Sequence, residues 1–221
     1  MAELRQERRH ELRRADVLRD IDRAFADSPI VLTLGGTARE MLAVAGRRPN
    51  HLVNLDAMGQ TVPVALGLAL GLGRDGDGGR RTVAVEGDGS LLMGFSVLTT
   101  VGHLRPANLV VIVLDNGVYL ATGGQPTAAA GVDLCAVADA CGWAGSRDVD
   151  GAGPLADALA WAAREPGPLL LRVRVGTGQV PTDFFLADPV VLASDFRRWL
   201  ARAEPTPGQG SPHAPGSPVG S

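Results

Sequence analysis

The sequence predicts an α/β fold, a doubly wound and mostly parallel sheet with helices on both faces. Short apolar runs alternate along the chain with segments of helical periodicity. Residues 82–85 have the composition of a buried strand, and residues 109–114 are the most apolar strand of all. Strands that alternate with helices in this way are typical of a parallel sheet. The 221 residues suffice for one sizeable α/β domain and are too few for two.

The order of the apolar and helical segments gives the expected elements. Helical spacing of apolar residues predicts helices over 37–45, 61–72, 91–104, 134–141, 154–164 and 190–203. Short apolar runs predict strands over 30–34, 51–55, 82–85, 109–114 and 169–175, with a further short strand near Trp143.

Three regions are expected along the chain. Residues 1–27 form an N-terminal amphipathic helix, in which acidic residues interleave with the arginines as on a solvated face. Residues 28–203 form the α/β domain. Residues 204–221 contain Pro, Gly and Ser without periodicity, so a disordered tail is expected there.

Composition excludes several classes of function. The net charge of -3 gives no support to a nucleic-acid or membrane-surface partner. The chain has no lysine, which rules out lysine Schiff-base chemistry. The charged N-terminus is unlike a signal peptide, and no run of about 18 apolar residues could span a membrane. A cytoplasmic location is therefore expected.

The segment 83–90, Val-Ala-Val-Glu-Gly-Asp-Gly-Ser, closes a strand and opens a helix. Ligands of a doubly wound sheet bind at the carboxyl ends of its strands. Gly87 and Gly89 let the backbone approach a ligand, and the free N–H groups of the helix suit a phosphate. Asp88 would repel a phosphate alone, but a divalent cation between them removes the conflict. The segment therefore predicts a phosphate-bearing ligand held together with Mg²⁺.

A second metal ligand is expected at the end of the neighbouring strand. Asn116 lies 28 residues after Asp88, the length of one helix and one return strand. The loop 116–127 is long, glycine-rich and partly apolar, as are many loops that cover a cofactor. A second Gly-Asp-Gly at 76–78 follows no strand and has no Asn at the matching distance, so we interpret it as a surface turn.

Gly-Asp-Gly followed at this distance by Asn resembles the motif of thiamine-diphosphate enzymes. The resemblance covers about residues 28–180 and implies the thiamine-diphosphate-binding fold, with thiamine diphosphate and Mg²⁺ as cofactors. It implies metal ligands at Asp88, Asn116 and Val118, and cofactor contacts at Gly87, Gly89, Ser90 and Val118.

Two further segments match this family. Met58, followed by Gly near a helix start, matches the apolar residue that wedges under the cofactor and bends its two rings into a V. An ordinary core methionine is the alternative. The family uses the backbone carbonyl two residues earlier to bind the pyrimidine amino group. That position is usually Gly and is Asp56 here, so its side chain must point away. Gly36 and Thr37 resemble the family's second diphosphate contact.

Within the family, the loop 116–127 is most similar to that of the β subunits of sulfopyruvate and phosphonopyruvate decarboxylases. The family's activating Glu comes from a second α/β domain, so this chain is expected to hold no catalytic residue. An α subunit is expected to supply the Glu in a hetero-oligomer. The resemblance implies a 2-oxo acid with a second anionic group, phosphonopyruvate ahead of sulfopyruvate. We predict that Tyr119, Thr122 and Gln125 line the substrate pocket.

Other functions remain open on the sequence. The chain could be a subunit of an acetolactate-synthase-like carboligase, the β chain of an oxidoreductase, or a degenerate cofactor-binding module without activity. The oxidoreductase would normally bring iron–sulfur cysteines, which Cys135 and Cys141 do not match. The presence of both Asp88 and Asn116 argues against a degenerate module.

A few polar residues and the two cysteines have no firm role. His51 could be an acid–base group or structural, and His103, late in a helix, is expected to be structural. Glu86 is expected in a buried strand, where it could contact the N-terminal helix; we assign it no function. The two cysteines, six residues apart in one expected helix, are predicted to be small buried residues.

Overall fold

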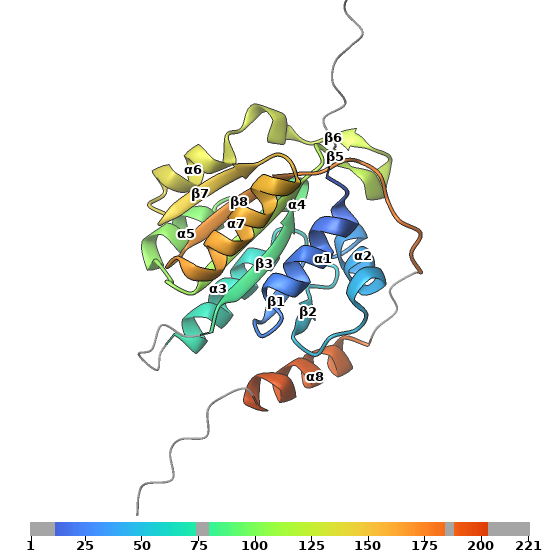
Figure 1. Cartoon of the computed structure of the whole chain (residues 1–221), viewed down its shortest axis with the longest axis vertical. Helices are drawn as coiled ribbons and strands as arrows, with labels where there is room; N and C mark the ends of the chain where they lie inside the picture. Colours follow the sequence, from blue (N-terminus) through green and yellow to red (C-terminus); the bar gives the residue numbers. More distant parts are fainter. Residues whose placement is uncertain (1–11, 74–79, 184–187, 203–221) are drawn as a thin grey trace, which may run out of the picture.

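The computed structural model describes residues 12–73, 80–183 and 188–202. Six parallel strands form the main sheet in the order β2-β1-β3-β4-β8-β7, which confirms the predicted α/β class (Figure 1). These strands are β1 (Ile30–Leu32), β2 (His51–Val53), β3 (Thr82–Gly87), β4 (Leu109–Asp115), β7 (Gly145–Val149) and β8 (Leu169–Arg174). A separate antiparallel hairpin pairs β5 (Val118–Tyr119) with β6 (Gln125–Pro126).

Helices connect the strands and cover both faces of the sheet. They are α1 (Arg14–Ala24), α2 (Gly36–Ala45), α3 (Thr61–Leu72), α4 (Asp88–Met93), α5 (Val97–Leu104), α6 (Leu134–Ala140), α7 (Ala152–Arg164) and α8 (Pro189–Arg202), with short 3-10 turns η1 (Leu120–Thr122) and η2 (Ala128–Gly131). One apolar core packs α1 and α7 against one face of the sheet, and a second packs α3, α5 and α6 against the other. The central strand β4 contributes to both cores, which explains its continuous apolar sequence.

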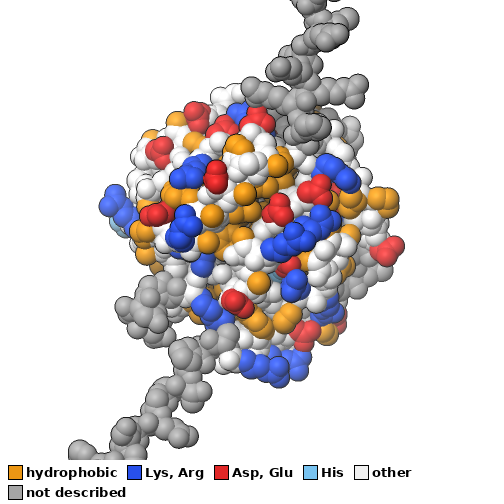
Figure 2. Space-filling view, in the orientation of Figure 1, with side chains coloured by type: hydrophobic (Ala, Val, Ile, Leu, Met, Phe, Trp, Pro, Cys, Tyr) orange, Lys and Arg blue, Asp and Glu red, His pale blue; other side chains and the backbone are white. Residues whose placement is uncertain are grey.

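The N-terminal helix is an integral part of the first core. Val17, Leu18 and Ile21 form its fully buried stripe. On its solvated side, Arg19 pairs with Asp16, three residues away. Figure 2 shows basic and acidic side chains interspersed over the face that includes α1 and α7. The rest of the region 1–27 before residue 12, the tail 204–221 and the turn at 76–78 lie outside the described residues.

The single helix expected over 91–104 is wrong. The structure has α4 starting directly at Asp88, a break after Met93, and α5 starting at Val97. The break follows from a close contact between Gly94 and the Gly59 backbone, where a Cβ on either glycine would overlap the other chain segment. This long-range contact, which local periodicity does not reveal, fixes the loop after Met58 against the end of α4.

None of His51, His103 and the two cysteines lines the cleft described below. His51 starts β2 at the opposite edge, and its Nε2 lies 3.0 Å from Asp22 Oδ1. Its pKa is lowered by burial, against the opposing effect of Asp22. Cys135 and Cys141 are partly buried rather than fully buried, and both pack against the second core. None of the described helices is long and apolar enough to cross a membrane.

Candidate cofactor and metal site

A cleft of about 340 Å³ opens where β1, β3 and β4 end. It brings together three segments that are far apart in the sequence: the start of α2, the Gly-Asp-Gly turn and the hairpin loop after β4. Of the residues predicted for the site, those lining the cleft are Gly36, Thr37, Met58, Gly87, Asp88, Gly89, Ser90, Asn116, Val118, Tyr119 and Thr122. Parallel strands place their carboxyl ends at one edge, which is why these segments converge.

Asp88 is buried in the floor of this cleft, with 3% of its surface exposed. Thr127 Oγ1 donates a hydrogen bond of 2.5 Å to Asp88 Oδ2, and the backbone N–H groups of Gly89 and Asn116 also point at the carboxylate. Burial raises the pKa of Asp88, the hydrogen bond from Thr127 opposes this, and the nearby negative charge of Asp115 adds to the rise. A carboxylate in such surroundings is stabilised by a bound cation.

The turn that presents Asn116 is held from both sides. Gly117 has φ 70°, a backbone conformation that favours glycine. The N–H of Gly117 donates to Asp115 Oδ1 at 3.0 Å, and that of Val118 donates to Asn116 Oδ1 at 3.1 Å. The other oxygen of Asp115 accepts from Arg172 Nε at 2.7 Å. The amide of Asn116 is therefore pre-positioned at the cleft, which lowers the entropic cost of binding an ion.

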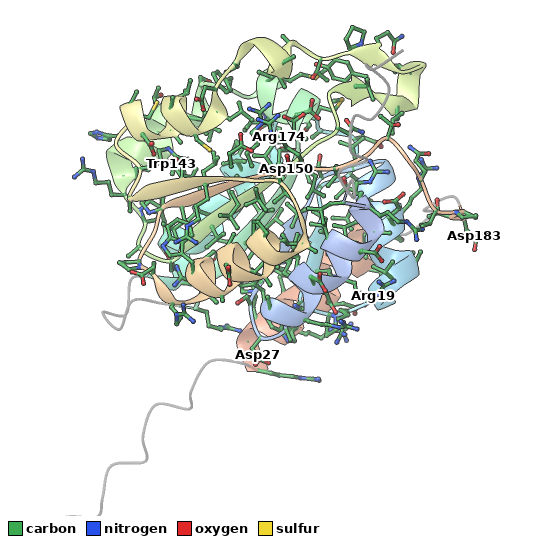
Figure 3. All side chains as sticks on the ribbon, turned by 45° about the horizontal axis from the view of Figure 1, so that its top comes forward. Arg19, Asp27, Trp143, Asp150, Arg174 and Asp183 are labelled. Atoms are coloured by element: carbon green, nitrogen blue, oxygen red, sulfur yellow. The ribbon has the colours of Figure 1, made fainter. Side chains whose placement is uncertain are left out.

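The ion-pair network continues along the carboxyl edge. Arg174 makes two hydrogen bonds to Asp148, at 3.0 and 2.7 Å. This interaction holds the pKa of Asp148 below its usual value. The hydrogen bonds to Asp148 raise the pKa of Arg174, and the negative charge of Asp150 raises it further. Figure 3 shows Arg174 and Asp150 close together at this edge. The pairs fasten β8 to β4 and β7, next to the turn that carries Asn116.

Two glycines of the cleft are required by their neighbours. A Cβ at Gly89 would overlap the ring of Tyr119, whose hydroxyl donates to the Gly89 carbonyl at 3.3 Å. A Cβ at Gly36 would stand 2.8 Å from Nη2 of Arg14. At Gly87, by contrast, a Cβ would meet nothing within 4 Å, because this residue faces open space. A backbone turn next to open space, with an acidic residue beside it, fits a diphosphate bridged to a metal ion.

A hydrogen-bond network joins the loops under the cleft. Ser90 Oγ accepts from the Gly59 N–H at 2.9 Å and lies 3.3 Å from Thr33 Oγ1. Glu86 is fully buried beside it and accepts from the Gly87 N–H at 3.1 Å. Burial raises the pKa of Glu86, while hydrogen bonds from Ser90 and Thr33 among others act in the opposite direction. The network sets the loop after Met58 relative to the Gly-Asp-Gly turn.

Glu86 does not make the contact with the N-terminal helix that its position in β3 left open. Glu86 points to the same face of β3 as Ala84, which belongs to the core with α3. Val85 points to the opposite face, toward α1. Successive side chains of a strand alternate between faces, so Glu86 cannot reach the N-terminal helix.

The loop that carries Met58 has an unusual backbone conformation at Asp56. Asp56 has φ 55°, in the left-handed region where most non-glycine residues are rare and where Asp is better tolerated. Glycine adopts this conformation readily, so the backbone at Asp56 suits a position that is usually glycine in the family. Met58 is 39% exposed and lines the cleft, unlike a core methionine.

The three residues predicted for the substrate pocket differ in placement. Tyr119 packs on Gly89, and Thr122 lies at the rim of the cleft. Gln125 is exposed and is not part of the cleft lining; its Nε2 donates to the Thr122 carbonyl at 2.7 Å. Gln125 thus holds the turn of the hairpin loop.

Sequence reasoning missed three residues that the structure places around the site: Arg14, Thr127 and Arg172. The sequence did contain a signal for Arg172, because this arginine interrupts the apolar run of β8. The structure shows that Arg172 is buried there. Thr127 closes the loop after Asn116, and only the fold shows that it reaches Asp88. Arg14 looks like any other arginine of its helix in the sequence.

A larger cavity of about 440 Å³ lies between α8 and the start of β2. It is lined by arginines, including Arg47 and Arg198, both of which already pair with Asp195. It lies away from the glycine-rich turns at the carboxyl ends of the strands. The smaller cleft is therefore the candidate site.

Residues 35–173 match the model of the thiamine pyrophosphate enzymes' C-terminal TPP-binding domain. The chain belongs to this family. Within the described residues, no three His, Cys, Asp or Glu side chains cluster as a metal site. A family-type ion at Asp88 would therefore take its remaining ligands from amide, carbonyl and phosphate oxygens.

Several relatives of this thiamine pyrophosphate enzyme domain are decarboxylases by name. Phosphonopyruvate decarboxylase of Streptomyces viridochromogenes is 38% identical over 185 residues, which are 84% of this chain and 44% of that protein. The protein of the same name from Streptomyces hygroscopicus is 38% identical over 202 residues, 86% of this chain and 47% of that protein. The chain thus spans under half the length of these two relatives.

A third relative is a shorter chain. Sulfopyruvate decarboxylase subunit beta of Methanothermobacter thermautotrophicus is 36% identical over 132 residues, 60% of this chain and 68% of that protein. Among solved structures, a putative thiamin diphosphate-dependent enzyme from Mycobacterium smegmatis superposes with a TM-score of 0.65 at 24% identity. The superposed part is 76% of this chain and 32% of that protein, and this likeness supports the fold.

Proposed function

We propose that this chain is the β subunit of a thiamine-diphosphate-dependent 2-oxo-acid decarboxylase, and that it binds the diphosphate and Mg²⁺. The observation that carries the proposal is the convergence of Gly36, Asp88 and Asn116 on one cleft at the carboxyl edge of the sheet. The names of the relatives support decarboxylation, and phosphonopyruvate leads sulfopyruvate as the substrate because those relatives match more of this chain.

When bound, thiamine diphosphate supplies a carbanion generator and an electron sink. The residues of this chain bind and orient it. The start of α2 at Gly36–Thr37 and the turn Gly87–Ser90 would hold the diphosphate. Oxygens of Asp88 and Asn116, with the Val118 carbonyl, would hold Mg²⁺. Met58 would support the two rings of the cofactor, and the Asp56 carbonyl would receive the pyrimidine amino group.

The activating Glu is assigned to an α subunit, which we propose covers the outer face of α3. This helix has no charged residue, and it is apolar on all sides. Its inner side is buried through Val62, Ala65 and Leu66, yet Val64 and Leu70 remain 37% and 38% exposed. A helix that is apolar all round is normally buried, and an exposed apolar surface of this kind marks an interface. One relative that this chain matches over 68% of its length is itself named subunit beta.

The interface is tested by Val64→Glu, with Val190→Glu as the matched control on α8, where Val190 is 75% exposed. Purified chain and α subunit are mixed and analysed by size-exclusion chromatography with light scattering. Val64→Glu should prevent assembly while the chain still folds, because a charge would be buried in the interface without a partner. An intact complex with Val64→Glu would refute the proposed face.

The activity is tested by carbon dioxide release from phosphonopyruvate, sulfopyruvate and pyruvate. The assembled enzyme with thiamine diphosphate and Mg²⁺ should turn over phosphonopyruvate fastest. Substituting the Glu of the α subunit by Gln should abolish turnover while the complex still assembles. Coupling of pyruvate to a second oxo acid would instead establish a carboligase. Turnover by the single chain without a partner would contradict the shared site.

A further inference from the structure

The N-terminal helix contributes a charged group to the cleft. Arg14, at the start of α1, has only 8% of its side chain exposed. Its Nε donates a hydrogen bond of 2.7 Å to Glu40 Oε2, and the other oxygen of Glu40 accepts from the Val180 N–H at 3.1 Å. Both oxygens of Glu40 are therefore engaged. The pair fastens α1 to α2, which lie side by side in Figure 1.

One nitrogen of Arg14 is left without a partner. Nη2 is buried and makes no hydrogen bond within the part of the chain that the structure describes. A buried donor of a charged group that finds no acceptor is costly, so native proteins rarely leave one. Arg14 also belongs to the lining of the cleft that holds Asp88 and Asn116. The unpaired nitrogen is thus placed where a ligand would meet it.

The guanidinium lies directly over the first turn of α2. Its Nη2, Cζ and Nη1 stand 2.8, 3.2 and 3.4 Å from where a Cβ of Gly36 would be. Gly35, the N-cap residue, has no side chain to cap the helix, so the N–H groups of Gly36 and Thr37 have no capping side chain. The positive end of the dipole of this ten-residue helix adds to the charge of Arg14. Two independent features therefore favour an anion at one place.

We propose that Arg14 is a cofactor-binding residue that donates from Nη2 to the diphosphate of thiamine diphosphate, together with the N–H groups of Gly36 and Thr37. The proposal rests on the proposed function, because the diphosphate is the ligand of that site. A diphosphate carries more negative charge than one Mg²⁺ neutralises, and Asp88 adds to the excess. Arg14 would supply balancing positive charge from the cleft wall. It also gives the N-terminal helix a role in binding.

A purely structural ion pair between Arg14 and Glu40 makes a different prediction. It would affect the stability of the fold and leave the affinity for a phosphate ligand unchanged. The test therefore measures the affinity for a ligand that lacks the thiamine rings. Magnesium pyrophosphate is suitable, because the diphosphate half of the site lies within this chain.

The first variant is Arg14→Lys, which retains a cation for Glu40 but has one nitrogen in place of the guanidinium fork. Titration calorimetry on the full chain should show magnesium pyrophosphate binding about tenfold to a hundredfold more weakly than wild type, the usual range for losing one charge-assisted hydrogen bond. Arg19→Lys is the matched control on the same helix, since Arg19 pairs only with Asp16 among the described residues. It should bind as wild type.

The second variant, Arg14→Met combined with Glu40→Met, removes the pair as a unit and leaves no buried charge unpaired. Its thermal melt should show a folded protein, and its affinity for magnesium pyrophosphate should be as low as that of Arg14→Lys or lower. Wild-type affinity in both variants would overturn the role of Arg14 and leave the proposed function standing. Variants that lose affinity for phosphonoacetate, a mimic of the substrate, but keep their affinity for magnesium pyrophosphate would also overturn the role of Arg14. Absence of pyrophosphate binding by the wild-type chain would refute the proposed function and this role together.

Discussion

Thr127→Val removes the hydroxyl that orients Asp88 while keeping the shape of the side chain. The lost hydrogen bond is short, at 2.5 Å, and both residues are buried, so solvent does not replace it. A hydrogen bond to a charged group contributes about 1.5–3 kcal/mol. Losing the partner of a metal ligand typically weakens metal binding by about 10–100-fold, and each factor of ten corresponds to about 1.4 kcal/mol. The two magnitudes agree.

The assay is a calorimetric titration of Mg²⁺ into the assembled protein at saturating thiamine diphosphate. Thr127→Val should bind Mg²⁺ about 10–100-fold more weakly than wild type. Thr127→Ser retains the hydroxyl, and with it the bond to Asp88 and the acceptor for the Ala129 N–H, so it should stay close to wild type. Equal Mg²⁺ affinity in the Val and Ser variants would refute the view that Thr127 positions the metal carboxylate.

Three further predictions concern the cleft. Met58→Ala should lower kcat more than cofactor affinity, because the V shape of the cofactor matters for its internal proton transfer; wild-type turnover would show that Met58 only packs. Gly89→Ala should lower stability by about 1–3 kcal/mol in thermal melts, since the new Cβ overlaps Tyr119. Gly87→Ala should not lower stability, because a Cβ there meets no neighbour. Equal melting temperatures of the two variants would contradict this account. Because burial raises the pKa of Asp88, the folded apo protein keeps this carboxyl protonated over a pH range in which the unfolded chain has already lost the proton. Its free energy of unfolding should therefore fall as pH rises through the carboxyl range, and urea titrations should show a smaller fall in Asp88→Asn.

The strands and the turns that line the cleft could be predicted because their signals are local. The Gly-Asp-Gly turn lies between an apolar strand and a helix, and Asn116 follows the next strand at a distance that fits one helix and one return strand. The rule that parallel strands place their ligands at one edge then brings the two together without any knowledge of the side-chain contacts.

What the sequence did not reveal depends on long-range contacts. The break between α4 and α5 is caused by Gly59, 35 residues before Gly94 in the chain. The partner of Asp88 is Thr127, 39 residues away. Arg14 is one of several arginines in its helix, and only packing of α1 on α2 distinguishes it. Such pairings depend on how the helices pack against the sheet. The periodicity of the sequence does not predict this packing.

The most direct test of the central claim is a titration of thiamine diphosphate against the assembled protein, with and without Mg²⁺. Wild type should bind tightly only with Mg²⁺, and Asp88→Ala should lose the Mg²⁺-dependent affinity while retaining its fold. Asp77→Ala, in the other Gly-Asp-Gly of the chain, should bind as wild type. Undiminished, Mg²⁺-dependent binding by Asp88→Ala would contradict the assignment of the cleft.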